Sequence, residues 1–447
     1  MSYEIPQKLQ YEEKIIFGLT SGQLMYAGIF APLAIALLLK TPFSVPVRVC
    51  IALIPSSLGV LFMFTTLPKQ ALNWVRWLFT KTYTKEKILT FTQHPQIKNN
   101  TLVFDGRKVA VIHVEPINFV IKNDKEREVI MIQFQKFLNS LTFPVQFLIT
   151  TNVLNVDTYL ANQEEKVEEV VKKTGTTKYA VIFEDFKQHF QETITAKGLL
   201  NRSFYMIIPE QRGSKLIIQT SVCEELLRNL NLKFTVLKED ELRNFLRGFA
   251  VNIYTNSESN ELFPIEALQN NPLDVSLNGI LHRTIIIRGY PRTVEEGFLN
   301  KIITLNGNID ISLHIEPFGV EHTMVMLNRE MQKQRADLWA LQRKEIINPT
   351  LEIQFEDTKK VLENLQKGSE RLFNVSLYVT CKASTSTDLE LITKKVEADL
   401  HALLMLPEQP RYEMHQALRK YPFVTSPRLC NKSSRFCPGV IRHSRIN

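Results

Sequence analysis

Two apolar runs, LMYAGIFAPLAIALLL (residues 24–39) and VCIALIPSSLGVLFMF (residues 49–64), decide how this chain is organised. Neither contains a charged residue, and each is apolar on every side when it is drawn as a helix. Each run has 16 residues, which would span about 24 Å as a helix, slightly less than a hydrocarbon layer of about 30 Å. The sequence predicts a transmembrane hairpin whose helices are bounded by Leu24 and Leu39 and by Val49 and Phe64.

Two alternatives compete with this interpretation. A buried helical hairpin in a soluble core would need protein packed around both helices, whereas a bilayer is an apolar partner on all sides. A cleaved signal peptide fits poorly, because the first run starts late and the second follows directly. We therefore expect a membrane hairpin, and we expect an arginine in place of Ala31 or Ala52 to detach it.

The flanks of the hairpin predict its orientation. Between the runs lies the nine-residue loop KTPFSVPVR, with a cation at each end (Lys40 and Arg48), while residues 67–87 carry five basic residues. Since basic residues favour the cytoplasmic side, we expect the loop outside and both termini in the cytoplasm of a cell with a plasma or inner membrane.

Residues 67–87 also contain two of the three tryptophans of the chain. Tryptophan prefers the headgroup layer, where its ring is half apolar and half hydrogen-bonded. Trp74, Arg76 and Trp77 are therefore predicted to be interfacial anchors. Packing of the tryptophans in a protein core is the alternative.

Composition indicates that the rest of the chain is ordinary globular protein. The 447 residues include 44% hydrophobic and 22% charged residues, enough for two or three domains. Of the net charge of +8, +7 lies in residues 411–447, so the remainder carries no strongly basic face. The five scattered cysteines predict neither a disulfide framework nor a zinc site, and they suit a reducing compartment.

Hydrophobic periodicity beyond the hairpin predicts two mixed α/β units with long helical insertions, giving an α+β fold. In the first unit, Asp105-Gly106 predicts a β-hairpin turn, Asp124 an N-cap, and Gly175 a break within a long helical stretch. In the second unit we expect a helix over residues 292–305 between two strands. The predicted segments are 1–88 (hairpin and interfacial segment), 89–250 (first α/β unit), 251–280 (exposed connector), 281–420 (second α/β unit) and 421–447 (basic tail, disordered or frameshifted).

The residues that could carry chemistry are few. The strands ending in IHVEP and LHIEP carry the pairs His113/Glu115 and His314/Glu316, each on one strand face, and this echo hints at a repeat. Two ligands do not make a metal site, and a polar strand end is the simpler interpretation. We find no G-x-S-x-G and no G-x-x-x-x-G-K-[ST] in the sequence. We therefore predict no catalytic, cofactor or metal site.

The order of the parts resembles proteins of type IV secretion systems. YEIPQKLQYEEKIIFGLTSGQLMYAG and the hairpin that follows are similar to the PrgI-like small membrane proteins. INFVIKNDKEREVIMIQFQKFLNSLTFPVQFLIT (residues 117–150) resembles the TraC-like N-terminal domain of conjugation ATPases, above all in FLNSLTFPVQ. RGYPRTVEEGFLN, DISLHIEP and LFNVSLYVT (within residues 288–380) resemble the N-terminal half of the same ATPases.

This resemblance implies a motor domain with nucleotide-binding motifs, and the sequence departs from it there. The likeness stops after YPFVTS (residues 421–426), and a frameshift or truncated gene end would explain the basic tail that follows. We expect a membrane-anchored scaffold of a conjugative secretion apparatus that contacts lipid, other channel subunits and its own copies, and is not itself an enzyme. The alternatives are an ATPase whose motor lies in a continuation of the frame, and a membrane-tethered nucleic-acid binder using the tail.

Overall fold

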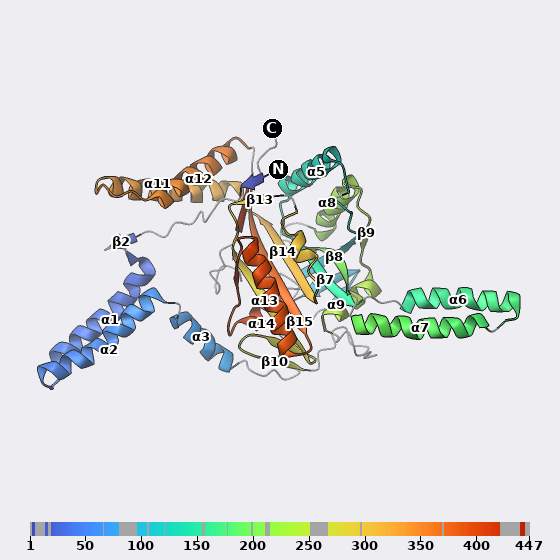
Figure 1. Cartoon of the computed structure of the whole chain (residues 1–447). Coiled ribbons are helices and arrows are strands. Elements are labelled where there is room, and N and C mark those ends of the chain that lie inside the picture. Colours follow the sequence, from blue (N-terminus) through green and yellow to red (C-terminus); the bar gives the residue numbers. More distant parts are fainter. Residues whose placement is uncertain are drawn as a thin grey trace.

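The structure is a computed structural model. It describes residues 2–4, 14–16, 19–65, 67–79, 96–104, 107–119, 121–153, 157–176, 178–197, 200–210, 215–250, 267–295, 297–368, 371–420 and 439–442. A helical hairpin, α1 (Ser21–Lys40) and α2 (Val45–Phe64), projects from one side of a large α/β body (Figure 1). The predicted α+β architecture is confirmed.

The body is built on one continuous sheet rather than two. Its strands follow the order β10-β11-β12-β15-β14-β7-β8-β6-β5-β4, and β9, β16 and β17 pair with β6, β12 and β15. Every neighbouring pair is antiparallel.

The first half of the sheet comes from residues 96–250. Its elements are β4 (Gln96–Lys98), β5 (Thr101–Phe104), β6 (Arg107–Val114), α5 (Asp124–Ser140), β7 (Val145–Val153), α6 (Asp157–Thr174), α7 (Lys178–Lys197), β8 (Leu200–Pro209), α8 (Leu216–Asn229), β9 (Phe234–Val236) and α9 (Glu239–Ala250). Strands β9, β6, β8 and β7 lie side by side in that order, with α5 and α8 as the connecting helices. This is the split βαβ, or ferredoxin-like, arrangement.

The second half repeats the first, element for element. Its elements are β10 (Leu268–Asn270), β11 (Val275–Leu277), β12 (Ile280–Gly289), α10 (Asn300–Ile303), β14 (Ile309–Pro317), α11 (Val320–Gln342), α12 (Pro349–Gln366), β15 (Leu372–Ala383), α13 (Ser386–Ala402), β16 (Leu406–Glu408) and α14 (Met414–Lys420). Here β16, β12, β15 and β14 lie side by side in the corresponding order, and β13 (Thr293–Glu295) is an addition. The chain therefore contains an internal structural repeat.

The two halves meet at strands β7 and β14, which are equivalent in the repeat. They pair antiparallel from Ile311 opposite Ile149 to Ile315 opposite Val145. Antiparallel pairing of equivalent strands relates the halves by an approximate two-fold axis through this seam, as in a dimer closed by strand pairing. Sequence reasoning saw two units but not the sheet that joins them.

Side chains alternate between the two faces of the sheet, and different helices cover each face. On one face, α5 and α8 pack on the first half around Ile112 and Met206, and α10 and α13 pack on the second around Ile285 and Val379. On the other face, α9 and α14 belong to a single apolar cluster that also includes Val109 of β6. This second cluster mixes residues of both halves and reinforces the seam.

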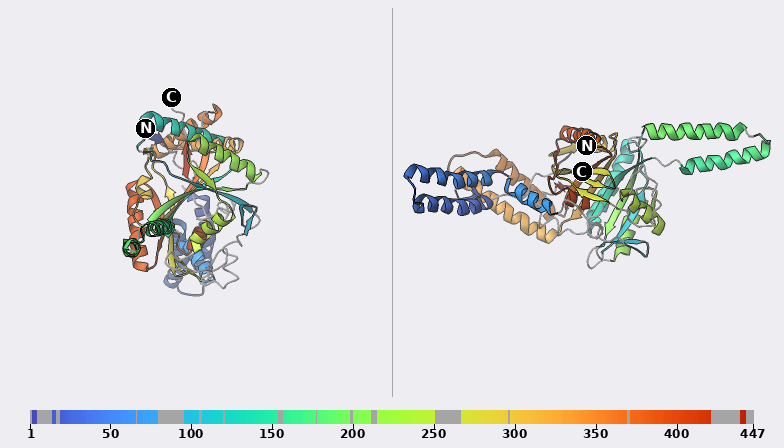
Figure 2. Two further views of the ribbon diagram at one scale, coloured as in Figure 1. Left: turned by 90° about the vertical axis from the view of Figure 1, so that its right-hand side faces the viewer. Right: turned by 90° about the horizontal axis from the view of Figure 1, so that it is seen from below.

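Each half carries a helical hairpin at the same point in its topology. The pair α6/α7 lies between β7 and β8, and the pair α11/α12 lies between β14 and β15. The first projects away from the side that bears α1 and α2, whereas the second projects toward it (Figures 1 and 2). Gly175, with φ of +65°, lies just after α6, as the predicted break required.

Several predicted boundaries were wrong. Residues 268–270 and 275–277 of the predicted exposed connector are strands of the sheet with mostly buried side chains, and residues 251–266 lie outside the described residues. Only Asn300–Ile303 of the expected helix over 292–305 is helical, since Gly297 adopts φ of +72° and β13 precedes it. The N-cap of α5 is Asn123, whose side chain accepts the N–H of Glu126 at 2.8 Å, and not Asp124.

Two further predictions fall partly outside the described residues. Strands β5 and β6 form the expected hairpin, while Asp105 and Gly106 themselves are not described. In the tail, residues 421–438 and 443–447 are not described, and Gly439–Arg442 forms strand β17 against β15 where disorder was predicted.

Candidate membrane interface

The α1/α2 hairpin is long and apolar enough to cross a membrane. Each helix has 20 residues, equivalent to about 30 Å. Both exceed the predicted runs, because α1 begins at Ser21 and α2 at Val45. Pro46 suits the first turn of α2, so the loop shrinks from nine residues to Thr41–Ser44. Leu24 and Leu39 lie within α1, and Val49 and Phe64 lie within α2, as predicted.

The two helices approach closely through small residues. Ala52, Pro55 and Gly59 are the buried residues of α2. A Cβ atom at Gly59 would lie 2.7 Å from the Cβ of Phe30, so only glycine allows this packing. The ring of Phe30 also lies edge-on to Phe62, with 5.6 Å between centroids. Small residues at a helix–helix contact are typical of membrane interfaces.

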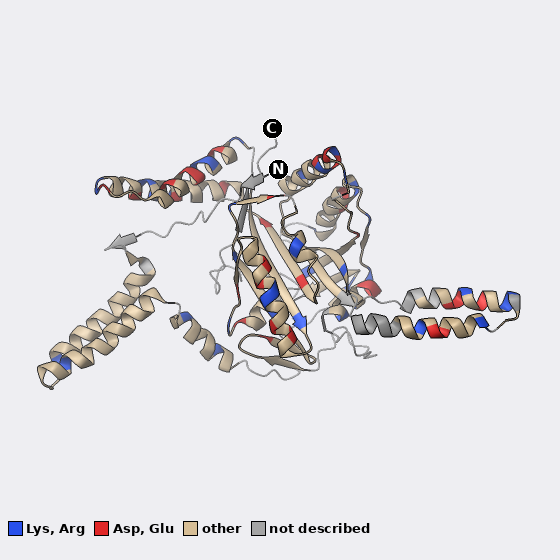
Figure 3. Ribbon diagram, viewed as in Figure 1, with Lys and Arg blue, Asp and Glu red and all other residues tan. Residues whose placement is uncertain are grey.

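The outward surface of the hairpin is apolar, and the described residues of the protein do not cover it. Large hydrophobic side chains on both helices are exposed over roughly two-fifths to two-thirds of their area, for example Leu39 at 69% and Ile54 at 68%. Lys40 ends α1 and Arg48 lies in the first turn of α2, and the tip of the hairpin is its basic part (Figure 3). Hydroxyl groups bond within their own helices, as when Ser56 Oγ donates to the carbonyl of Ala52 at 2.9 Å. Such a surface suits lipid, where polar groups must be satisfied internally.

Both tryptophans that were predicted to be interfacial anchors lie on helix α3 (Leu67–Leu78), but their environments differ. Trp77 is 8% exposed, donates from Nε1 to the carbonyl oxygen of Asn270 at 2.9 Å, and lies 5.7 Å from the Tyr412 ring. Trp77 therefore packs in the protein core and attaches α3 to the body. This is the alternative stated above, and the prediction that Trp77 is a headgroup anchor was wrong.

Trp74 lies one turn before Trp77 on a neighbouring part of the α3 surface, but it is not packed against the body as Trp77 is. It is 45% exposed, and it shares a helix face with Leu67 and Leu78, which are also exposed. Arg76 is exposed as well. The helix thus presents an apolar face next to the end of α2, as expected of an interfacial helix. Lys81, Lys85 and Lys87 lie outside the described residues.

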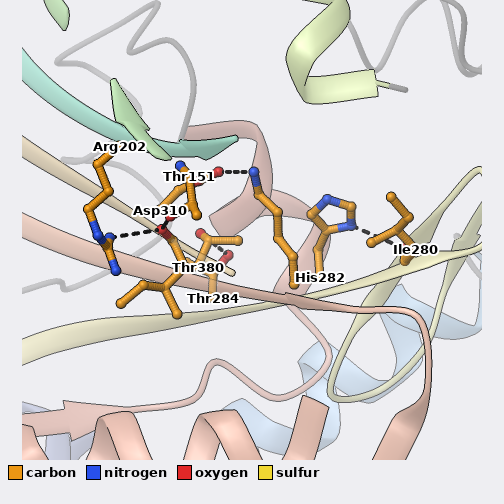
Figure 4. A network of polar contacts seen from close by, with 9 residues as sticks. Thr151, Arg202, Ile280, His282, Thr284, Asp310 and Thr380 are labelled. Carbon is orange, nitrogen blue, oxygen red and sulfur yellow. Dashed lines mark hydrogen bonds and ion pairs between the residues drawn. The ribbon is translucent and has the colours of Figure 1, made fainter. Parts of the chain in front are cut away.

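A buried polar network joins the two halves of the sheet (Figure 4). The carboxylate of Asp310 accepts the backbone N–H of Thr151 at 2.8 Å and forms an ion pair with Lys382. Thr151 belongs to the first half, and Asp310 and Lys382 belong to the second. Arg202 donates to the carbonyl of Leu305 at 2.6 Å, and burial lowers its pKa. These contacts hold the seam together, which is a structural role.

His282 lies beside this network and is 4% exposed. Its Nδ1 lies 3.1 Å from the carbonyl oxygen of Ile280. Burial, and then the charge of Lys382, lower the pKa of His282 to about 3. The ring therefore stays neutral at physiological pH.

The two His-x-Glu pairs occupy unrelated places in the repeat. His113 lies on β6, the counterpart of β12, whereas His314 lies on β14, the counterpart of β7. His314 Nε2 is 2.9 Å from Ser312 Oγ, and Glu316 accepts from Asn374 at 3.3 Å. The sequence echo does not mark the true repeat. Within the described residues, no group of three or more His, Cys, Asp or Glu is arranged to hold a metal ion.

His113 instead lines a cavity of about 380 Å³ between the sheet and α9. Its ring lies 5.3 Å from Tyr205, which in turn lies 4.7 Å from Phe245. Among the described residues that line the cavity, Glu241 carries a carboxylate, and its Oε2 accepts the N–H of Lys238 at 2.9 Å. The wall of the cavity is thus aromatic and weakly polar, and these contacts do not indicate a catalytic function.

Comparison with known proteins bears on the first half alone. Residues 100–230 match the family described as the archaeal TraC-like domain. The match runs from the start of β5 to the end of α8, under a third of the chain, and includes FLNSLTFPVQ. No curated protein matches the chain.

Proposed function

We propose that this chain is a membrane-anchored scaffold of a conjugative type IV secretion apparatus. One observation carries the proposal: a hairpin whose outer surface is apolar and bare is attached to a body whose first half matches the TraC-like domain. The hairpin anchors the body at a plasma or inner membrane, and its resemblance to PrgI-like proteins suits a channel component. The body would position other channel subunits and further copies of the chain.

The path of the chain supports placing both sides of the hairpin in one compartment. Strand β1 (Ser2–Glu4) precedes α1, and it pairs with β13, which follows α2 in the sequence. Such pairing requires that the chain cross the membrane an even number of times between them. The larger number of basic residues after α2 than in the α1/α2 loop favours the cytoplasmic side.

The anchor can be tested with charges on the exposed hairpin surface. Leu33→Arg combined with Ile54→Arg puts two cations near the bilayer centre, at a cost of about 5–7 kcal/mol. We expect this variant to be extracted from membranes by alkaline carbonate. Ala52 is unsuitable for the test, since it is buried against α1 and its replacement would also disturb packing.

Helix α7 offers a matched control for the anchor. Val181 is 68% exposed, as Ile54 is, and Ile182 is 66% exposed. Val181→Arg combined with Ile182→Arg adds the same charge on an arm that projects away from α1 and α2. The control should remain in the membrane fraction. Carbonate-resistant association of the Leu33/Ile54 variant would contradict the anchor.

The scaffold role is tested separately from the anchor. We propose that the 447-residue chain does not itself turn over nucleotide, because its sequence has no phosphate-binding loop. ATP hydrolysis by the purified chain would favour the alternative, an ATPase. Co-purification with other channel subunits from cells that assemble the apparatus would support the scaffold, and recovery free of them would contradict it.

A further inference from the structure

The tip of the α11/α12 hairpin carries apolar side chains that the described residues leave bare. Trp339 is 60% exposed, Ile346 is 52% exposed and Ile347 is 80% exposed. All three lie in the last turn of α11 or in the turn that follows it. The base of the hairpin, in contrast, has a packed core around Leu327, Val361 and Leu365. The exposed apolar surface is therefore a feature of the tip.

Basic residues surround these side chains. The guanidinium of Arg335 lies 5.7 Å from the centre of the Trp339 ring, and Arg343 and Lys344 are exposed in the turn. Residues 335–349 carry three basic residues against two acidic ones, Asp337 and Glu345. Tryptophan and isoleucine beside cations match the boundary between acyl chains and anionic headgroups.

The direction of the hairpin points to the same partner. Helices α11 and α12 project from the side of the body that carries α1 and α2, and the views agree on this (Figures 1 and 2). The equivalent hairpin of the first half, α6/α7, projects the other way. One arm of the repeat thus lies on the membrane side of the molecule.

We propose that the tip of α11/α12 is a second, peripheral membrane contact that inserts Trp339, Ile346 and Ile347 into an anionic lipid surface. This rests on the proposed crossing of the membrane by α1 and α2. The tip contact fixes how the body is tilted over the bilayer, because two separated points of attachment remove a rotation that a single hairpin leaves free.

A fluorescent label at the tip tests the proposal in the full-length chain. Ile347→Cys is labelled with a polarity-sensitive dye after Cys50, Cys430 and Cys437 are replaced by serine. Cys223 and Cys381 can remain, because both are buried and burial raises the pKa of each thiol to about 12. In nanodiscs that contain anionic lipid, we expect a blue-shifted emission that nitroxide-bearing lipids quench.

Two further labels separate this proposal from the anchor. The native Cys50, exposed on α2, reports on the hairpin, and Val181→Cys reports on the opposite arm. Quenching at positions 50 and 347 but not at 181 supports the tip contact. Quenching at 50 without quenching at 347 overturns the tip contact and leaves the anchor standing. Absence of quenching at 50 overturns both.

Charge reversal identifies the partner as anionic lipid. Arg343→Glu with Lys344→Glu should weaken insertion of the tip by at least about 30-fold, because two attractive charges are lost and two repulsive charges are added. Lys359→Glu with Lys360→Glu changes the total charge equally on the exposed side of α12 and should have little effect. A blue shift at position 347 that persists in detergent, without lipid quenching, would indicate a protein partner and overturn the proposal.

Discussion

At the scale of single residues, a hydrogen bond from Trp77 helps to attach α3, which follows the hairpin, to the body. Trp77→Phe removes the bond to the carbonyl of Asn270 while keeping a ring against Tyr412. We expect the free energy of unfolding to fall by about 1 kcal/mol. Trp74→Phe is the matched control, and in detergent it should change stability by less than about 0.5 kcal/mol. Denaturant unfolding of the solubilised protein measures both, and a larger loss for Trp74 would contradict the assignment.

His282 makes a second residue-scale prediction, on pH. Its pKa is about 3 in the folded chain against an ordinary 6.5, so between these values the unfolded state binds more protons. Stability contributed by the neutral ring is present above pH 6.5 and is lost as the pH falls below it, by up to about 1.4 kcal/mol per pH unit. The loss continues toward pH 3.

A variant separates the contribution of His282 to stability from that of carboxylates that are protonated over the same pH range. His282→Gln removes the ionisable ring, so the difference in unfolding free energy between the two proteins should change steadily between pH 6 and pH 4. A constant difference over that interval would show that the ring is protonated in the folded chain.

At the scale of elements, the contact between α1 and α2 depends on one glycine. Gly59→Ala places a methyl group 2.7 Å from Phe30, and such overpacking costs about 1–3 kcal/mol. Gly28→Ala, on the partner helix, meets nothing within 4 Å and should be neutral or stabilising, since alanine favours a helix. Thermal unfolding in detergent compares the two variants. Equal melting temperatures would contradict the packing described.

Elements with a strong local pattern could be predicted from the sequence, and those set by distant partners could not. The α1/α2 hairpin follows from its apolar runs, and α6 and α7 follow from the long helical stretch with a break at Gly175. Strands β10 and β11 lie in an Asn- and Pro-rich segment, and they are strands because β11 pairs with β12 and β10 pairs with β11. Trp74 and Trp77 are similar in sequence context, and docking against Asn270 distinguishes them. The two His-x-Glu-Pro motifs did not reveal the repeat, because they lie on strands that are not equivalent and the repeat is one of strand order.

At the scale of the whole molecule, the seam between β7 and β14 predicts cooperative unfolding. One continuous sheet, a buried hydrogen bond from the Thr151 N–H to the Asp310 carboxylate, and an apolar cluster with residues from both halves join the two halves tightly. We expect residues 96–250 and 267–420 to unfold in one transition. Hydrogen exchange should give the central amides of β7, β8, β14 and β15 similar, maximal protection. Two separated transitions would indicate independent domains.

The pairing of β1 with β13 has a consequence for how the protein is made. Residues 2–4 are synthesised before their partners at 293–295, which follow only after about 290 further residues. At about 5–20 residues per second, the N-terminal strand waits roughly 15 to 60 s for its partner. Both apolar helices are complete long before then. In the membrane topology proposed above, β1 can therefore pair with β13 only after the hairpin has inserted, and the pairing then fixes that topology.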